Sequence, residues 1–474
     1  MKQLTGVDEM FFSLEAPNSP MHITDIHIYD PSTAPEGRVT NEDVLKYISQ
    51  RLDKLFMREK RVPVPMGLDY SYWVEDEAFD LDYHVRFTKL PKPGNWDQLV
   101  AKAGQIIETP LDISRPLWEI HVIEGLDKVE GFPKGCFAIV HKKHHGQFDG
   151  GSATYLKSVM HTLEPEGVTD AEGDTAKQQK PSGRTPSASE LLVQTYWNSL
   201  LKKPIDRLNF FYRTLPNASK ALNAFIMDKI RTPSYARTRF SGTIPSPKRV
   251  FEAVTVSLKD IINMRKLVAG STVNDVVLTI FGGAIRKYLE HHQELPSKPL
   301  LGLIPISVRR EEEIADGGNK IFSMVSDMHS EIADPLERMK KVHEATNYSK
   351  QFTEAIGGRN MTEMLEIAPM PIIDRGVKIA LKTKMADYAQ SLDSGVGISN
   401  VPGSRQPLYF CGAKQLRCFN WGFIMDGMGL LLVAGSYCDD LVLTAVSCPE
   451  MLPDPKFFKT CMQESVDALS QAKA

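Results

Sequence analysis

The stretch HKKHHGQFDGGSA, residues 141–153, places three histidines and one carboxylate within nine positions of a chain that has only 12 histidines. The apolar run CFAIV (136–140) precedes it and is typical of a buried strand. The segment SATYLKSVMHTL (152–163) follows, with apolar residues at helical spacing and Ser152 as the predicted N-cap. We therefore predict a strand that ends at the histidines, a glycine-rich turn, and a helix.

The histidines and the aspartate allow three interpretations: a metal site, a general base, or satisfied polar side chains at a strand end. Neighbouring side chains on a strand point to opposite faces, so His144 and His145 do not easily share one ion. His141 and His145 share a face but lie roughly 13 Å apart at ~3.3 Å per residue, so we predict no metal. A neutral imidazole suits a general base at pH 7, and Asp149 would brace the turn. From the residues alone, two interpretations stay open: a general base, and satisfied polar side chains at a strand end.

Length and composition indicate a globular protein with two domains, or with one large pseudo-symmetric body. The chain has 474 residues, of which 42% are hydrophobic and 24% charged, and a formal net charge of −3. This length exceeds one ordinary core, and the balanced charge argues against broad nucleic-acid binding. The six cysteines form no CxxC pair, so we predict reduced thiols and a cytoplasmic protein.

No segment has the pattern of a signal peptide or a membrane span. The N-terminus, MKQLTGVDEMFFSLEAP, carries acidic residues within its apolar part. The longest apolar run, GMGLLLVAGSY (427–437), is shorter than the ~18 residues that a membrane span needs and predicts a buried strand. We expect any membrane contact to be peripheral.

Strand-like and helix-like segments recur in two regions, 1–165 and 250–474. Between them, 166–249 begins with a polar stretch rich in Gly, Pro, Ser and Thr and continues with helical patterning. We predict an N-terminal domain that carries the histidines, a flexible linker followed by a helical connector, and a C-terminal domain. Asn41 is the predicted N-cap of one helix, and Ser271 or Thr272 opens another.

The segment HHGQFDG (144–150) matches the HHxxxDG signature of the CoA-dependent acyltransferase superfamily. That superfamily includes chloramphenicol acetyltransferase-like enzymes and condensation domains of nonribosomal peptide synthesis. Five further segments resemble the bacterial wax ester synthase/diacylglycerol acyltransferase family: PMHI (20–23), LDYHVR (81–86), RPLWEIHVIEGL (115–126), VNDVVL (273–278) and SNVPG (399–403). They occur in the family's order and span nearly the whole chain.

The resemblance implies two chloramphenicol acetyltransferase-like α/β domains, with the active site in a tunnel at their interface. Acyl-CoA would enter from one side as a co-substrate, with no permanently bound cofactor, and the alcohol from the other. The resemblance also implies that His145 is the general base, that Asp149 is a structural brace, and that Asn274 lies near the reaction centre. For His144 two roles stay open: orienting the turn, or filling space.

These residues suggest direct transfer in a ternary complex. His145 would accept the alcohol proton while the oxygen attacks the thioester carbonyl. Asn274, in the first turn of its predicted helix, would help to stabilise the oxyanion, although a plain helix-start residue fits equally. The sequence has no GxSxG elbow, and no acyl-enzyme is required.

Three residues beside the base depart from the family's pattern: Lys143, Gly146 and Gln147. We expect them to set this protein's acceptor preference. A cation at Lys143 would also disfavour the imidazolium form of His145, although an exposed lysine is the commoner outcome.

Two further sets of residues are candidates for substrate contacts. Basic partners for the CoA phosphates, each equally compatible with a solvated surface, are Lys202, Lys203, Arg231, Arg237, Arg239, Lys248 and Arg249. Two methionine-rich segments, 361–373 and 423–432, would line an acyl tunnel or belong to the core.

We predict an O-acyltransferase that joins a fatty acyl group from acyl-CoA to a long-chain alcohol or to diacylglycerol. One alternative is an enzyme of the same fold that acts on a short, branched or sterol-like alcohol, or on an amine. Others are a condensation domain and a weakly catalytic lipid-binding protein. Peripheral contact with the inner membrane or with lipid droplets fits such substrates, and the oligomeric state is not predicted.

Overall fold

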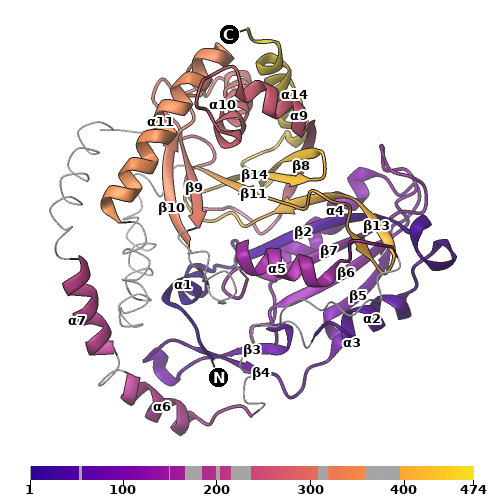
Figure 1. The fold of residues 1–474 in the computed structure, drawn as a ribbon, viewed down its shortest axis with the longest axis vertical. Helices are drawn as coiled ribbons and strands as arrows, with labels where there is room; N and C mark the ends of the chain where they lie inside the picture. Colours follow the sequence, from indigo (N-terminus) through magenta and orange to yellow (C-terminus); the bar gives the residue numbers. More distant parts are fainter. Residues whose placement is uncertain are drawn as a thin grey trace.

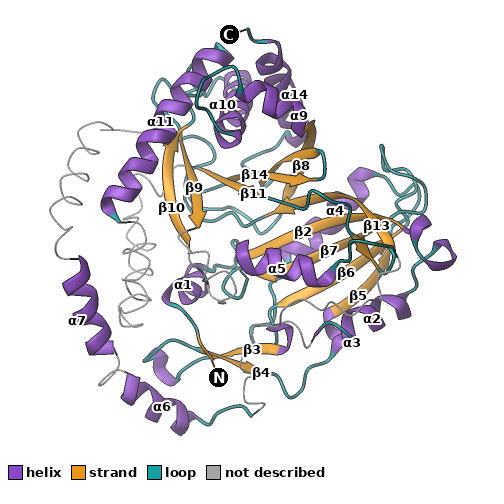
Figure 2. Ribbon diagram, viewed as in Figure 1, coloured by secondary structure: helices purple, strands orange, loops and turns teal. Residues whose placement is uncertain are grey.

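The computed structural model describes residues 2–52, 56–148, 150–165, 184–198, 203–214, 236–307, 319, 321–357, 375 and 395–473. Two six-stranded mixed sheets and one small three-stranded sheet organise this part of the chain. Figure 1 shows the two large sheets one above the other, with helices around them. Figure 2 marks the same elements by type.

The first large sheet carries the histidine motif near its centre, in the order β12–β13–β2–β7–β6–β5. Only β5 and β6 are parallel; the other neighbours are antiparallel. Its strands are β2 (His22–Asp30), β5 (Val85–Lys89), β6 (Trp118–Glu124), β7 (Phe137–His144), β12 (Tyr409–Phe410) and β13 (Ala413–Trp421). The strand predicted before the histidines is therefore confirmed as β7, flanked on both sides.

Two strands of this sheet come from the far end of the chain. β13 pairs with β2 from Lys414 opposite Asp30 to Trp421 opposite Thr24. Alternating hydrophobicity predicts a strand but not its partner, so the sequence did not indicate this exchange. The domain limits at 165 and 250 stay a prediction.

The second large sheet has the order β10–β9–β11–β14–β15–β8. Its strands are β8 (Val250–Ser257), β9 (Leu301–Ser307), β10 (Ile321–Asp327), β11 (Val396–Val401), β14 (Leu430–Tyr437) and β15 (Asp440–Ser447). The helices packed around it are α9 (Leu258–Arg265), α10 (Val273–His291), α11 (Pro335–Ile356) and α14 (Pro455–Gln471). The longest apolar run in the sequence forms β14, in the centre of this sheet.

Helix α4 (Trp96–Glu108) joins the two large sheets, because it contacts both β7 and β8. The Trp96 ring lies 5.8 Å from the Phe251 ring and 5.0 Å from the Phe419 ring, measured between centroids. One continuous apolar cluster includes side chains from both sheets and from α4. The two sheets therefore share one core.

The remaining elements surround the histidine motif or lie beyond it. The helices are α1 (Gly6–Leu14), α2 (Asn41–Ser49), α3 (Leu81–His84), α5 (Gly150–Met160), α6 (Ala188–Trp197) and α7 (Lys203–Thr214). The small sheet contains β1 (Lys2–Gln3), β3 (Glu59–Val62) and β4 (Tyr72–Glu75). Figure 1 shows α6 and α7 outside the two large sheets.

The helix starts were predicted with mixed success. Thr272 caps α10, as predicted. α2 is capped by Thr40 and not by Asn41, because Thr40 and Asp43 form a reciprocal capping box. Ser152 is not a cap, since α5 already includes two glycines before it.

All six cysteines are free, and four of them are buried, which agrees with the prediction of reduced thiols. Among the described residues, no helix is both long enough and apolar enough to cross a membrane. The polar segment predicted as a flexible linker, 166–183, lies outside the described residues.

Candidate active site

The turn after β7 is fixed by backbone hydrogen bonds on both sides of the histidine pair. The amide of His144 donates to the carbonyl of Leu117 at 3.0 Å, and the amide of His145 donates to the carbonyl of Met21 at 2.8 Å. The sheet therefore determines where the pair lies. Asp149, the predicted brace, lies outside the described residues.

His144 is buried and takes part in the geometry of the turn. Its Nδ1 accepts a hydrogen bond from the Gly146 amide at 3.0 Å. Its ring stacks on Phe12 with the centroids 4.4 Å apart and the planes 8° apart. Because Nδ1 accepts, the proton belongs on Nε2, which lies 3.6 Å from a Glu15 carboxylate oxygen. Of the two roles left open, this geometry favours orienting the turn.

His145 is half-buried, and its ring is held by two aromatic side chains. Phe11 stacks on one face with the centroids 4.1 Å apart, and Phe423 approaches edge-on at 5.5 Å. The cluster around them consists of buried Val7, Phe11 and Met21 with partly buried Met10, Leu14, Ile321, Phe423 and Met425. An imidazole thus lies in an apolar environment formed by both ends of the chain.

Helix α1, which supplies both stacking rings, was not predicted from the sequence. Thr5 and Asp8 form a capping box that starts the helix. Phe11 and Phe12, adjacent in sequence, then contact His145 and His144 respectively. The capping pattern TxxD followed by two phenylalanines could have predicted this helix. No sequence rule connects it with a motif about 130 residues later in the chain.

Gly146 and Gln147 have packing partners in the structure. A Cβ atom at Gly146 would lie 2.6 Å from a ring carbon of Phe12, so the close approach of that ring requires glycine. The Gln147 side chain accepts from the Leu117 amide at 3.2 Å and donates to the Glu59 carbonyl at 3.2 Å. Packing against Phe12 and hydrogen bonding to the backbone therefore account for Gly146 and Gln147 without any role in selecting the acyl acceptor.

Lys143 is not an exposed lysine; its side chain is 1% exposed. Its ammonium group lies 2.5 Å from a carboxylate oxygen of Asp25, which also pairs with Lys157 at 3.0 Å and accepts from Asn420 at 2.6 Å. Burial alone would raise the pKa of Asp25, but the two lysines hold it well below its usual range. Because Lys143 is paired with Asp25, it does not act on His145 as a lone cation.

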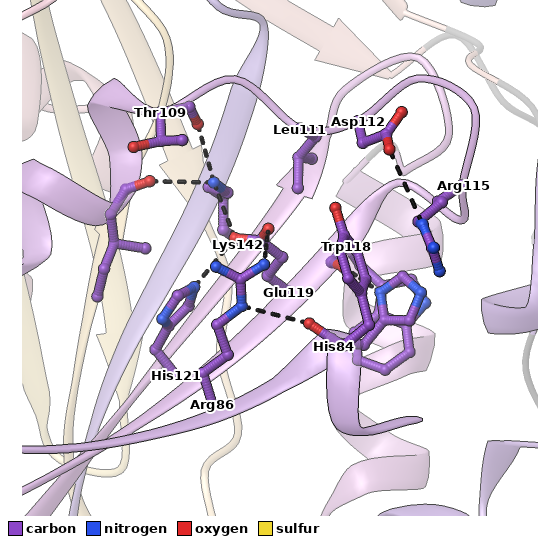
Figure 3. Close-up of polar contacts among 12 residues, drawn as sticks. His84, Arg86, Thr109, Leu111, Asp112, Arg115, Trp118, Glu119, His121 and Lys142 are labelled. Carbon is purple, nitrogen blue, oxygen red and sulfur yellow. Dashed lines mark hydrogen bonds and ion pairs between the residues drawn. The ribbon is translucent and has the colours of Figure 1, made fainter. Parts of the chain in front are cut away.

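The opposite face of β7 carries a second buried lysine, shown in Figure 3. The Lys142 ammonium group donates to the backbone carbonyls of Ile106 and Thr109 at 3.0 and 2.9 Å, at the C-terminal end of α4. It also pairs with Glu119 at 3.0 Å. A cation at this helix end satisfies carbonyl groups that lack a helical partner, so Lys142 fixes α4 against the motif strand.

Asn274 is the second residue of α10 and is half-buried. In the described part of the chain, no hydrogen bond joins it to His145, so its role at the reaction centre stays a prediction. Its neighbour Asp275 is fully buried and accepts hydrogen bonds from His343 at 2.9 Å and Thr346 at 2.7 Å. Asp275 therefore anchors the start of α10 to α11.

The candidate CoA-binding cations are largely occupied by protein partners. Lys203 is buried and pairs with Asp69. Arg239 pairs with Glu294 at 2.7 Å, and the Arg249 guanidinium donates to backbone carbonyls. Lys202 and Arg231 lie outside the described residues.

Among the residues that the structure describes, two groups bring metal-ligand atoms within 4.8 Å of one another: Asp25 with His27 and Cys418, and Asp327 with His329 and Glu331. In the first group two ammonium groups already pair with the carboxylate, which disfavours a further cation. In the second, His329 Nδ1 already lies 2.9 Å from a carboxylate oxygen of Glu331. Neither group includes His145.

A cavity of about 20 Å³ lies beneath α5, which is enough for one water molecule and far too small for an acyl chain. Its polar lining consists of His27, Tyr29, His141, Lys157 and His161. It therefore does not represent the predicted substrate tunnel, which stays a prediction. The methionine-rich segment 361–373 lies outside the described residues, whereas 423–432 contributes Phe423 and Met425 beside His145.

Comparisons with known proteins match both parts of the chain to one family. Residues 4–277 match the model of the wax ester synthase/diacylglycerol acyltransferase catalytic domain, and residues 317–470 match the model of its C-terminal domain. An O-acyltransferase of Acinetobacter baylyi is 29% identical, with 98% of this chain and 96% of the relative covered. A probable diacylglycerol O-acyltransferase of Mycobacterium tuberculosis is 27% identical, with 98% of each chain covered.

Solved structures support the predicted pair of chloramphenicol acetyltransferase-like domains. A wax ester synthase/diacylglycerol acyltransferase from Marinobacter aquaeolei matches with a TM-score of 0.68 and 24% identity, covering 99% of this chain and 98% of that one. A trichothecene 15-O-acetyltransferase from Fusarium sporotrichioides matches with a TM-score of 0.61 and 9% identity, covering 98% and 94%. At these identities the likeness establishes the fold.

Proposed function

The chain belongs to the wax ester synthase/diacylglycerol acyltransferase family, and on that premise we propose that His145 is the general base of its reaction. The protein is an acyl-CoA-dependent O-acyltransferase that transfers an acyl group to an alcohol or to diacylglycerol. The observation that carries the assignment of the base is the setting of His145: a half-buried imidazole on a rigid turn, surrounded by apolar side chains.

The residues support direct transfer. His145 takes the proton of the acceptor hydroxyl as its oxygen attacks the thioester carbonyl, and the C–S bond then breaks. The imidazolium returns the proton to the departing CoA sulfur, so protons and charges balance without an acyl-enzyme. We propose Asn274 and the free amides of the first turn of α10 as donors to the oxyanion, and Asp149 as the brace of the turn.

A long apolar acceptor suits this site better than a short one. The cluster around His145 includes three methionines, which adapt their shape to varied chains. We therefore propose a long-chain alcohol or diacylglycerol as the acceptor. The alternative is an enzyme of the same fold whose acceptor is a short, branched or sterol-like alcohol or an amine. One experiment distinguishes the two proposals.

The test is an acceptor panel. Purified protein is incubated with palmitoyl-CoA and hexadecanol, dipalmitoylglycerol, ethanol, a sterol or hexadecylamine, and both CoA release and product are measured. We expect ester from the long-chain alcohol or the diacylglycerol, and almost none in the His145→Ala variant. CoA release without any product, or full activity in the variant, would sink the proposal.

We also propose that α6 and α7 contact a lipid surface. Their exposed apolar side chains are Leu192, Val193, Tyr196, Trp197, Ile205, Leu208 and Tyr212. Tyr and Trp suit the boundary between lipid and water, because their rings are apolar and their tips polar. Strand β4 and the segment before it contact the ends of both helices, since Asn198 donates to the Tyr72 hydroxyl at 3.1 Å and Lys203 pairs with Asp69.

Vesicle flotation measures this contact. Wild-type protein should float with phosphatidylcholine vesicles, and the double variant Trp197→Glu/Leu208→Glu should remain in the soluble fraction. Activity toward a short-chain acyl-CoA and a dissolved alcohol should be the same in both proteins. Equal flotation of the two proteins would contradict a lipid-binding role for these helices.

A further inference from the structure

One side chain from the C-terminal half contacts the backbone of the base. Asn319, which is 1% exposed, precedes β10, far from the motif in sequence. Its Nδ2 donates to the carbonyl oxygen of His145 at 2.9 Å. The same Nδ2 donates to Oδ1 of Asp8 at 2.7 Å, and the Asn319 backbone amide donates to that oxygen at 2.8 Å.

The orientation of this amide is determined by its partners. Both neighbours of Nδ2 are acceptors, one a carboxylate and the other a carbonyl, so nitrogen and oxygen cannot be exchanged. The Asp8 carboxylate is itself fixed, because its Oδ2 accepts from the Thr5 amide at 2.9 Å in the capping box of α1. Both hydrogens of Nδ2 are therefore used, and the helix that carries Phe11 and the backbone of the base share one donor.

The restraints on His145 come from both parts of the chain. On the backbone, its amide donates to Met21 and its carbonyl accepts from Asn319. On the ring, Phe11 stacks on one face and Phe423 contacts it edge-on. Each pair has one member from the first 21 residues and one from beyond residue 318, so a shift between these segments would move the imidazole.

We propose that Asn319 is a positioning residue for the base and that it couples the orientation of His145 to the contact between the two halves. This inference rests on His145 being the base. Asn319 does not transfer a proton; it fixes the peptide that carries the imidazole. In the described part of the chain its Oδ1 has no hydrogen-bond partner, so both of the hydrogen bonds that its side chain makes are donated by Nδ2.

Exchanging the side chains of Asp8 and Asn319 distinguishes an effect on the position of His145 from an effect on folding. In Asn319→Asp, both Nδ2 bonds are lost and two carboxylates face each other. In Asp8→Asn/Asn319→Asp, a side-chain bond between positions 8 and 319 is restored with reversed polarity. The backbone amide of residue 319 loses its acceptor at position 8, and the carbonyl of His145 still lacks its donor. A variant of another contact between the halves, Lys456→Met, removes the 2.8 Å pair of Lys456 with Asp97 and serves as the control.

The readouts are the thermal midpoint, kcat, and KM for palmitoyl-CoA with hexadecanol as acceptor. We expect the swap to recover part of the thermal midpoint lost in Asn319→Asp, because the buried pair is again one carboxylate and one amide, while kcat stays about 10- to 100-fold below wild type and KM changes little. Lys456→Met should keep wild-type kcat. If Asn319→Asp does not fold, the kcat and thermal midpoint of the swap are compared with those of wild type, and this comparison alone tests the inference.

Recovery of kcat together with the thermal midpoint in the swap would overturn the inference and leave Asn319 a purely structural residue. Wild-type kcat in a folded Asn319→Asp would do the same. The proposed base is tested separately by His145→Ala in the same assay. Activity in that variant refutes the base, whereas an inactive His145→Ala with a fully active swap refutes only the positioning role.

Discussion

Gly146→Ala probes the packing of α1 against the histidine motif. The new Cβ would lie 2.6 and 2.9 Å from two ring carbons of Phe12 and 3.0 Å from Nδ1 of His144, all closer than ordinary contacts. The Phe12 ring has little room to move, because it stacks on His144 and the Arg61 guanidinium lies over it at 4.3 Å. The substitution must therefore displace α1 or the turn.

The size of the effect follows from two opposing terms. Overpacking in a filled site costs about 1–3 kcal/mol. Replacing glycine by alanine gains about 0.4–1 kcal/mol, because the unfolded chain loses freedom. We expect a net loss of about 1–2 kcal/mol of stability. Activity should fall as well, since α1 also carries Phe11, which stacks on His145.

A double-mutant cycle isolates the contact. Thermal midpoints and rates of CoA release are measured for Gly146→Ala, Phe12→Ala and the double variant. Once the ring is gone, alanine at position 146 should cost nothing further. Wild-type stability in Gly146→Ala, or an equal cost with and without the ring, would refute the argument from close approach.

Three further predictions concern buried polar groups: the Asp25 cluster, two histidines, and Asp275. Asp25→Asn leaves buried Lys143 and half-buried Lys157 without a carboxylate and should cost about 3–5 kcal/mol in chemical denaturation. Lys143→Met leaves Asp25 paired with Lys157 and should cost about 1–3 kcal/mol, so equal costs would contradict this order. Burial holds the pKa values of His27 and His141 well below 6.5, so the unfolded chain binds protons first as the pH falls below ~6.5. The free energy of unfolding should be lower at pH 5 than at pH 7.5, by up to ~1.4 kcal/mol per pH unit for each histidine. The thermal midpoint should fall with it, and a midpoint that does not change with pH would contradict neutral burial. Asp275→Ala removes the capping box of α10 and two hydrogen bonds from α11. The free energy of unfolding, measured by chemical denaturation, should fall by about 2–3 kcal/mol. An unchanged free energy would show that α10 does not depend on this anchor.

The local elements around the motif could be predicted from the sequence. Apolar residues before His141 and helical spacing after the turn gave β7 and α5, because periodicity reflects which face is buried. Strand alternation also separated His144 from His145, and the structure places their rings on different phenylalanines. The resemblance added the family, which the comparisons confirmed.

Long-range partners could not be predicted in the same way. A charged residue on a strand is expected to face solvent, and Lys143 is buried only because Asp25, 118 positions earlier, neutralises it. Asn319 contacts His145 across 174 positions, and β13 joins a sheet that begins almost 400 residues earlier. Local pattern carries no information about such pairings, so these contacts had to come from the structure.

The most direct test of the central claim is the rate of the chemical step in His145→Gln. Enzyme in excess over palmitoyl-CoA is mixed with saturating hexadecanol, and ester formation is followed in a single turnover. Loss of the general base should slow this step by about 10²- to 10⁴-fold, with palmitoyl-CoA still bound. A variant that forms ester within about twofold of the wild-type rate would contradict the assignment of His145 as the base.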